Sequence, residues 1–513
     1  MRIPALILTC LVFIFSSSVF AQQSSQQSLA FKKKAFGWQF YPLYIPDYSY
    51  QFEESFYLTQ KANKGEPLAQ QELAIRFLTG EGFPADTARA IYWMQKAADQ
   101  DLPSARYNLG IFYLNGWGLT WNPFTAYNCI KNAAMHGMAD AQYLIGVFST
   151  EDLIVPRNYD TAMVWIEQAA ANSFKPAIET KKKLEKIIER KKELQAKTKQ
   201  EQFYQSQNTQ QSVTGADMDF MNELAKTNKT VSDTEKFRSL LQGCPTDLKI
   251  ALGFTGSDTL LQGPIDSLMK TIELAADCGS PEANVFFGRC YETGVMFKRS
   301  ETDAALYYLR AFRLESPEAG YYLSKLLEKT EFTAALEKAA AKKEPRAQYV
   351  LAILQSDGGQ NASYRTRLLT EMKEAANKEL IPALLELGEV YFKGKYVERD
   401  SALAFQYWTK AEDLGNREAY LRIALAKLFL KKDCRELPTL PELEKFENRG
   451  SILALLIQGY LYETGVCNTV NRSKAVECYR KAAFRGNSTA YSSLKRLYNS
   501  LRPDSPEFKI AEE

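Results

Sequence analysis

Small and apolar residues recur along this chain with a period of 36 positions. Alanine marks each period, a large apolar residue stands four positions later, and glycine often follows at the next position. Within a period the apolar residues are spaced as on one face of a helix and do not alternate as in a strand. Self-similarity of this length is typical of a solenoid of helical repeats. The recurring alanines are Ala69, Ala105, Ala141, Ala177, Ala283, Ala319, Ala347, Ala383 and Ala419.

Each period predicts two helices separated by tight turns. The first helix runs through segments such as residues 141–148 and 383–392, and it ends at a corner rich in glycine. Glycine favours such a corner because a helix often ends on a residue with positive φ, which glycine reaches at little cost. The second helix follows in segments such as residues 87–100. We therefore predict an all-α fold, an α/α solenoid of about ten helix-turn-helix repeats in two blocks.

Bulky aromatic residues recur in the predicted second helix, where small residues let neighbouring helices approach closely. We interpret these aromatic residues as core residues that fill the space between layers. The alternative is a set of aromatic side chains that holds a ligand. The residues are Trp93, Trp165, Tyr308, Trp408 and Tyr479.

The combined pattern, Ala-x3-Leu-Gly-x2-Tyr-x2-Gly followed by Ala-x2-Trp/Tyr and Lys-Ala-Ala-x2-Gly, resembles the Sel-1-like repeat, a relative of the tetratricopeptide repeat. The resemblance implies stacked helical hairpins and a protein that binds other proteins, because members of this family are generally interaction scaffolds. Some units depart from the pattern, as at Asp152 and Leu430, where glycine is expected. The best matches span residues 105–137, 283–315, 383–415 and 454–486.

Composition divides the chain into six segments. A charged stretch and a glutamine-rich stretch separate the two blocks of repeats, and we interpret them as a linker that begins as a helix. The expected segments are a signal peptide (1–21), an aromatic-rich segment or cap (22–54), the first repeats (55–178), the linker (179–234), the second repeats (235–498) and a tail (499–513).

The first residues of the chain predict export. Arg2 precedes an apolar run from Ala5 to Phe15, and small residues then lead to Ala21. This order fits a secretory signal peptide better than a transmembrane helix, so we expect cleavage after Ala21. The expected localisation is the periplasm or the exterior of a bacterium, or the endoplasmic reticulum lumen in a eukaryote.

Two pairs of cysteines have roughly the spacing of one repeat. Cys244 and Cys278 are 34 positions apart, and Cys434 and Cys467 are 33 apart, which places each pair on adjacent layers. Stacked helices lie about 10 Å apart, and flexible corners can bring Cα atoms to the roughly 4.4–6.8 Å that a disulfide requires. We expect both disulfides in an oxidising compartment. The cysteines interpreted as free thiols are Cys129, Cys290 and Cys478.

An unusual aromatic segment follows the predicted signal peptide. Eight of the seventeen residues in 36–52 are aromatic, and Pro42 and Pro46 exclude a regular helix. Such a segment packs as a cap over the apolar end of the first repeats, or it is a docking strip for a partner. We favour the cap.

Charge and motif content exclude several functional classes. The chain has 64 basic and 61 acidic residues, a balance that does not select for nucleic acid, and glutamates interleave with the basic residues of 181–199. His136 is the single histidine, so metal sites and catalytic triads that use histidine lack material. Ser267 and Lys270 have the Ser-x-x-Lys spacing of penicillin-interacting enzymes, without the accompanying motifs. We expect no catalytic residue, metal, cofactor or membrane span in the mature chain.

The main hypothesis is a secreted or periplasmic adaptor that binds a protein or an extended peptide in a concave groove lined by first helices. Cell-envelope components are among the expected partners. Two alternatives stay open. One is a module that binds peptidoglycan or another glycan through exposed aromatic side chains, and the other is a β-lactam-acting enzyme that uses Ser267 and Lys270. The pattern specifies neither the residues of the groove nor the oligomeric state.

Overall fold

The fold of the chain is helical throughout its described part, and the predicted all-α solenoid is confirmed. No strand is present among these residues, and none of their helices is both long and apolar enough to cross a membrane. The signal peptide and its cleavage site at Ala21 lie outside them. The computed structural model describes residues 43–45, 50, 53–205, 265–355, 362–431 and 437–510.

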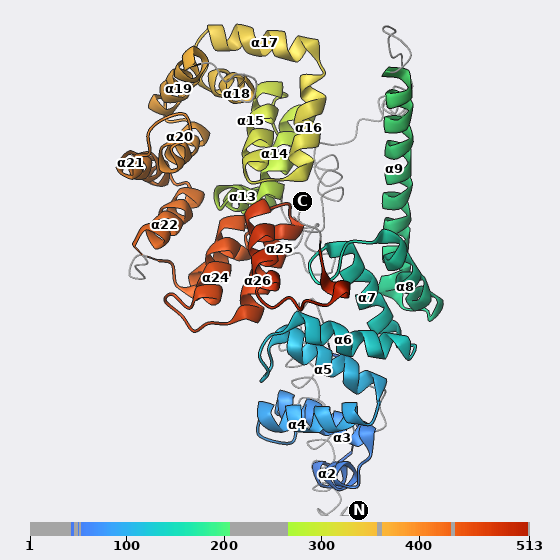
Figure 1. Cartoon of the computed structure of the whole chain (residues 1–513). Helices are drawn as coiled ribbons and strands as arrows, with labels where there is room; N and C mark the ends of the chain where they lie inside the picture. Colours follow the sequence, from blue (N-terminus) through green and yellow to red (C-terminus); the bar gives the residue numbers. More distant parts are fainter. Residues whose placement is uncertain are drawn as a thin grey trace, which may run out of the picture. The chain divides into compact units, whose positions relative to one another are not determined.

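The helices group into two compact units. The first unit comprises residues 1–212 together with 495–513, and the second unit comprises residues 213–494. In the first unit, helical hairpins stack one on the next in the order of the chain (Figure 1). Its helices are α2 (Ser55–Asn63), α3 (Pro67–Thr79), α4 (Thr87–Asp99), α5 (Pro103–Asn115), α6 (Pro123–Met135), α7 (Ala139–Glu151), α8 (Tyr159–Ala171) and α9 (Lys175–Gln205).

Capping residues fix the ends of the helices in each repeat. Gly80 and Gly116 end α3 and α5 in the left-handed conformation, with φ of 77° and 64°, as the glycine-rich corners predict. The second helix then begins at a polar N-cap. At α4 this residue is Asp86, whose side chain accepts a 3.0 Å hydrogen bond from the backbone N–H of Arg89. One such cap stabilises a helix by about 1 kcal/mol.

The first and second helices of a repeat meet where glycine faces a bulky side chain. A Cβ atom added to Gly388 would lie 2.2 Å from Nε1 of Trp408, a distance at which one of the two residues must move. The same contact joins Gly288 to Tyr308 and Gly459 to Tyr479. The glycine column and the aromatic column of the sequence are therefore the two sides of one contact.

Two of the predicted core aromatics lie elsewhere. In the first unit Ile130 and Ile166 face the repeat glycines, and they stand 25 positions after their repeat alanines. Trp93 and Trp165 stand only 24 positions after theirs and are half-buried. One position turns a helical side chain by about 100°, away from the facing helix. The core prediction was wrong for these two residues.

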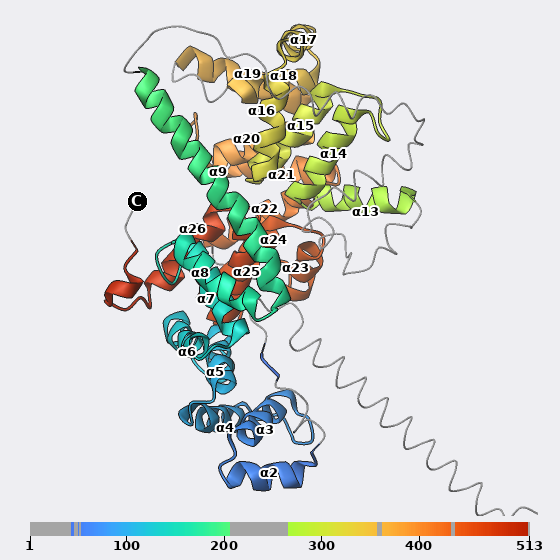
Figure 2. The same ribbon diagram turned by 90° about the vertical axis from the view of Figure 1, so that its right-hand side faces the viewer.

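The second unit follows the same hairpin pattern with less regular repeats. Figure 2 shows its helices from a second direction. They are α13 (Ile265–Asp277), α14 (Pro281–Thr293), α15 (Glu301–Arg313), α16 (Pro317–Leu327), α17 (Thr330–Ala341), α18 (Pro345–Gln355), α19 (Ala362–Asn377), α20 (Ile381–Lys393), α21 (Ser401–Asp413), α22 (Arg417–Lys431), α23 (Leu440–Glu447), α24 (Ile452–Thr464), α25 (Arg472–Phe484) and α26 (Ser488–Asn499), whose last residues belong to the first unit.

The second unit curls into a ring in which early and late hairpins touch (Figure 1). Arg485 donates from Nε to the carboxylate of Glu282 at 2.7 Å, although the two residues are 203 positions apart. The backbone N–H of Ser488 donates to Glu315 at 2.6 Å. These contacts close the ring between its first and last repeats.

The predicted linker begins as part of the first unit. Helix α9 extends over 31 residues, and its first turns pack on α8 through Leu184, which is buried with Ala162 and Ile166. Ile187, three positions further along the helix, is exposed. The first part of α9 is therefore the last helix of the first stack.

Candidate functional site

Polar side chains line the first helices of the first unit. Glu72 on α3 and Asn108 on α5 both stand three positions after a repeat alanine, and Arg76 lies one turn beyond Glu72. All three are at most 4% exposed. We call the surface formed by Glu72, Arg76 and Asn108 the first-helix face.

Asn108 binds both backbone polar groups of Tyr44. The Tyr44 N–H donates to Asn108 Oδ1 at 2.8 Å, and Asn108 Nδ2 donates to the Tyr44 carbonyl oxygen at 2.8 Å. The two residues are 64 positions apart. One side-chain amide thus replaces the pair of hydrogen bonds that an extended residue forms with a neighbouring strand.

Arg76 extends this backbone contact along the chain. Its Nη1 donates to the carbonyl oxygen of Glu53 and its Nη2 to that of Tyr50, each at 2.7 Å. Its Nε donates to Glu72 at 3.0 Å, so the guanidinium is oriented by a buried carboxylate. The planar guanidinium has several donors in fixed directions, which suits two carbonyl oxygens at once.

Side-chain contacts add to the attachment of this segment. The Tyr50 hydroxyl donates to Glu66 at 2.9 Å, and burial together with this hydrogen bond raises the pKa of Tyr50. Leu43 is buried. Lys61 pairs with Glu53 at 2.7 Å. The described residues of the aromatic segment therefore lie against the first repeats, as a cap does. The side chains of Asn108 and Arg76 bind mainly the backbone of this segment.

The contacts to Tyr44, Tyr50 and Glu53 have a chemical consequence. Asn108 and Arg76 recognise amide and carbonyl groups that every residue except proline offers. Asn108 therefore holds its residue largely independently of the side chain, whereas Arg76 holds two carbonyl oxygens next to the start of α2, where the Glu53 N–H also donates to the Tyr50 oxygen at 3.1 Å. Gln71, fully buried beside Glu72, still has an Nε2 donor without a partner.

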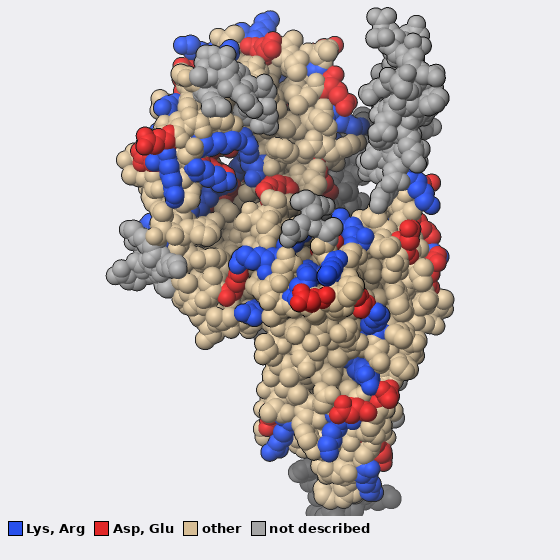
Figure 3. All heavy atoms as spheres, in the orientation of Figure 1, with Lys and Arg blue, Asp and Glu red and all other residues tan. Residues whose placement is uncertain are grey.

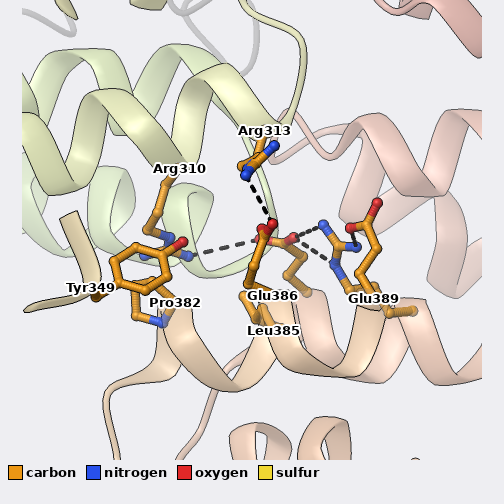
Figure 4. Close-up of a pocket in the computed structure, with 9 residues that line it drawn as sticks. Arg310, Arg313, Tyr349, Pro382, Leu385, Glu386 and Glu389 are labelled. Atoms are coloured by element: carbon orange, nitrogen blue, oxygen red, sulfur yellow. Dashed lines mark hydrogen bonds and ion pairs between the residues drawn. The ribbon is translucent and has the colours of Figure 1, made fainter. Parts of the chain in front are cut away.

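The equivalent positions in the second unit are used differently. Glu386 on α20 and Arg422 on α22 also stand three positions after a repeat alanine, and they belong to a buried ion-pair cluster (Figure 4). Arg422 pairs with Glu389 at 2.6 Å and with Glu418 at 2.7 Å. Arg313 on α15 pairs with Glu386 at 2.9 Å, across the ring.

This cluster has no room for a ligand. The cavity that its side chains line measures about 20 Å³, which accommodates no more than a water molecule. Burial raises the pKa of Glu386. Burial also opposes ionisation of Glu389, but Arg422 and Lys393 outweigh it and lower the pKa of Glu389 to about 2. The cluster stabilises the ring, and a concave groove open to a partner is not formed here.

The residues considered for chemistry are not brought together. Ser267 and Lys270 are both exposed on α13, and no hydrogen bond joins their side chains. His136 is exposed and its Nδ1 contacts the carbonyl oxygen of Asn132. On the face drawn in Figure 3, basic and acidic side chains are interspersed over the described surface.

The cysteines divide into free and bonded residues. Cys129, Cys290 and Cys478 form no disulfide, as predicted. Cys278 is also a free thiol, and burial raises its pKa to about 11. The expected pairing with Cys244 is therefore not present, and Cys244 itself lies outside the described residues. Cys467 is not among the free thiols, and Cys434 lies outside the described residues, so that pairing stays a prediction.

The C-terminal tail makes a contact that the sequence pattern did not indicate. Phe508 is buried against Phe124 and Tyr127, with ring centroids 5.1 and 5.6 Å away. Arg502 donates to the carbonyl oxygens of Leu153 and Ile154, at 2.7 and 3.1 Å. These residues all belong to the first unit. The tail lies outside the repeat period, so no periodic signal marks it.

Stacked helical hairpins with a recurrent glycine contact define a solenoid protein of the helical-repeat class. Comparison with known families gives the particular repeat. The family model of the Sel1 repeat matches residues 67–102, 103–138, 139–174, 281–316, 381–416 and 453–487. The chain is therefore a Sel1 repeat protein. Such proteins generally mediate protein–protein interactions and are typically scaffolds without enzymatic activity.

Two solved structures are similar to this chain. A protective antigen present in uropathogenic Escherichia coli strains and displaying an SLR fold is 20% identical, over 88% of this chain and 91% of that chain, with a TM-score of 0.29. A Sel1 repeat protein from Oxalobacter formigenes is 30% identical, over 25% of this chain and 96% of that chain, with a TM-score of 0.24.

Proposed function

We propose that this protein is a scaffold that binds an extended segment of a partner protein on the first-helix face of its first unit. One observation carries the proposal. Asn108 and Arg76 together form four hydrogen bonds to the backbone of a polypeptide segment that is remote from them in sequence. The six Sel1 repeats support a role in protein interaction.

The second unit supplies a reason to place the binding site in the first. The corresponding residues of the second unit, Glu386 and Arg422, already form ion pairs within that unit. Removing one member of a buried ion pair lowers the free energy of unfolding by about 3–5 kcal/mol. The β-lactam alternative gains no support from the exposed, unconnected pair Ser267 and Lys270.

We extend the proposal to the compartment. The apolar run from Ala5 to Phe15 and the small residues that lead to Ala21 support export to the periplasm or the exterior. An oxidising compartment would permit a bond between Cys434 and Cys467. Cell fractionation and N-terminal sequencing of the mature chain test this part. A mature chain that begins at Gln22 is the expected result, and retention of the first residues in the cytoplasm would contradict it.

Affinity capture with a matched variant tests the binding function. The mature chain and its Asn108→Asp variant, which keeps the size of the side chain and loses the Nδ2 donor, are used as bait in envelope extract. We expect a protein that wild type retains stoichiometrically and the variant retains poorly. A partner held equally by both baits would place the binding surface elsewhere, and no partner for either bait would remove the support for a scaffold.

A further inference from the structure

The segment that lies on the first-helix face belongs to the protein itself. We infer that residues Leu43–Ile45 act as an intramolecular ligand that occupies the partner site at Asn108 and that an extended segment of the partner protein must displace. This inference rests on the proposed function and concerns the regulation of the same site. The occupant that the structure shows is the chain's own backbone at Tyr44.

The nature of the contact makes the segment replaceable. A cap that serves only to cover an apolar end is held by its side chains, which fit one place. Here Asn108 takes the N–H and the carbonyl of one residue, and Arg76 takes two further carbonyls. Any extended residue offers Asn108 the same N–H and carbonyl, so an exchange at Asn108 would conserve both hydrogen bonds. The Arg76 contacts differ, because the Tyr50 carbonyl oxygen also accepts from the Glu53 N–H at 3.1 Å, as in a turn that leads into α2.

The polar groups beneath the segment explain why the site is occupied. Asn108 is fully buried, and Arg76 and Glu72 are nearly so. A buried donor or acceptor without a partner is destabilising. An unoccupied face is therefore unfavourable wherever water cannot reach these atoms, and the chain's own segment satisfies them until a partner binds.

Tethering sets the strength of the competition. A segment joined to its site by a short stretch of chain has an effective concentration on the order of millimolar. A free peptide of the same sequence therefore binds the intact protein poorly, although its contacts would be identical. Weakening the internal segment raises the apparent affinity for the free peptide by the same factor, up to the affinity of the unoccupied site.

One substitution weakens the internal segment without touching the site. Tyr44→Pro removes the N–H that donates to Asn108 Oδ1. Tyr44→Phe keeps both backbone groups and serves as the matched control. The probe is a fluorescein-labelled synthetic peptide of residues 41–54, and its binding to full-length mature chains is followed by fluorescence anisotropy. Circular dichroism verifies that each variant is folded.

We expect the peptide to bind the Tyr44→Pro chain roughly fivefold more tightly than wild type or Tyr44→Phe, because one net hydrogen bond contributes about 1 kcal/mol. In the double variant Tyr44→Pro with Asn108→Ala this gain should disappear. Equal affinity for wild type and Tyr44→Pro would overturn the inference of self-occupation. So would a gain that survives the loss of Asn108.

The captured partner separates this inference from the proposed function. If Tyr44→Pro increases retention of the partner as well as of the peptide, both stand. If the partner binds wild type and Tyr44→Pro equally and still depends on Asn108, the scaffold function stands and the self-occupation is refuted. If peptide and partner both bind without regard to Asn108, the first-helix face is not the binding site.

Discussion

Replacing Gly388 by alanine tests the contact that organises the repeats. In an exposed helix interior, Gly→Ala stabilises by about 1 kcal/mol because alanine has the higher helix propensity. At Gly388 the new Cβ would lie 2.2 Å from Trp408 Nε1 and 2.4 Å from its Cδ1. Trp408 is 3% exposed and donates to the Leu385 carbonyl at 3.2 Å. The ring can therefore move only by disturbing packed neighbours and a buried hydrogen bond.

The magnitude follows from opposing contributions. Insertion of a methyl group into a packed core costs about 1–3 kcal/mol, and the Trp408 hydrogen bond contributes about 1 kcal/mol. The helix propensity returns about 1 kcal/mol. We therefore expect Gly388→Ala to lower the free energy of unfolding by about 1–3 kcal/mol. Gly320 offers the matched control, because its added Cβ would meet nothing closer than 3.6 Å, and Gly320→Ala should raise stability.

A compensating pair sharpens the test. In the first repeat Ala74 stands where other repeats have glycine, and Met94 stands where they have a branched or aromatic residue; both are fully buried. The double variant Gly388→Ala with Trp408→Met copies this pair. Gly388→Ala should therefore lower the free energy of unfolding less in the Trp408→Met background than in wild type. Urea unfolding followed by circular dichroism measures all four chains. Gly388→Ala at or above wild-type stability would refute the steric argument.

Three further predictions follow from the contacts of the two units. Phe508→Ala should destabilise the first unit by about 3–5 kcal/mol, seen as faster proteolysis of that unit, and unchanged cleavage rates would mean that the tail only rests on the surface. The pKa of Glu389 in the folded state, about 2, lies below its ordinary value of 4.5. The stability that the ionised Glu389 contributes is therefore fully present above about pH 5 and is lost as the pH falls from about 5 to about 2. The stability gap between wild type and Glu389→Gln should narrow over that range, and a constant gap in urea unfolding would contradict it. Asn158→Ala should cost about 1 kcal/mol in thermal unfolding, because the Asn158 side chain caps α8, whereas Asn158→Ser should cost little.

Local features of the repeat could be predicted from the sequence because they depend on neighbours within a few turns. The glycine corners and the helix ends follow from residues such as Gly80 and Asp86, which act on the backbone beside them. The core position could be predicted only where the register was exact. Trp93 and Trp165 stand one position before the residue that faces the repeat glycine, so their side chains point away from the first helix and are only half-buried.

Contacts between distant residues could not be predicted from the period. Nothing in the spacing pairs Arg485 with Glu282, 203 positions away, because a small rotation per repeat decides whether a solenoid stays open or closes on itself. The same limit applies to the tail, where Phe508 packs on Tyr127. It applies also to Asn108, because nothing in the repeat pattern indicates that this residue binds the backbone of Tyr44. Repeat spacing also predicted a disulfide at Cys278, which is a free thiol. Spacing alone therefore does not identify a disulfide.

The two units use one position of the Sel1 repeat for opposite purposes. Three residues after the repeat alanine, the first unit places Glu72 and Asn108, and the second places Glu386 and Arg422. In the second unit these side chains bond across the closed ring, so that a partner would have to separate buried charges at about 3–5 kcal/mol for each uncompensated group. In the first unit Glu72 pairs with Arg76, but Asn108 bonds to a polypeptide backbone that another backbone can replace with no charge left unpaired. The cost of exchange, more than the presence of polar residues, is what distinguishes a binding face from a structural core in this protein.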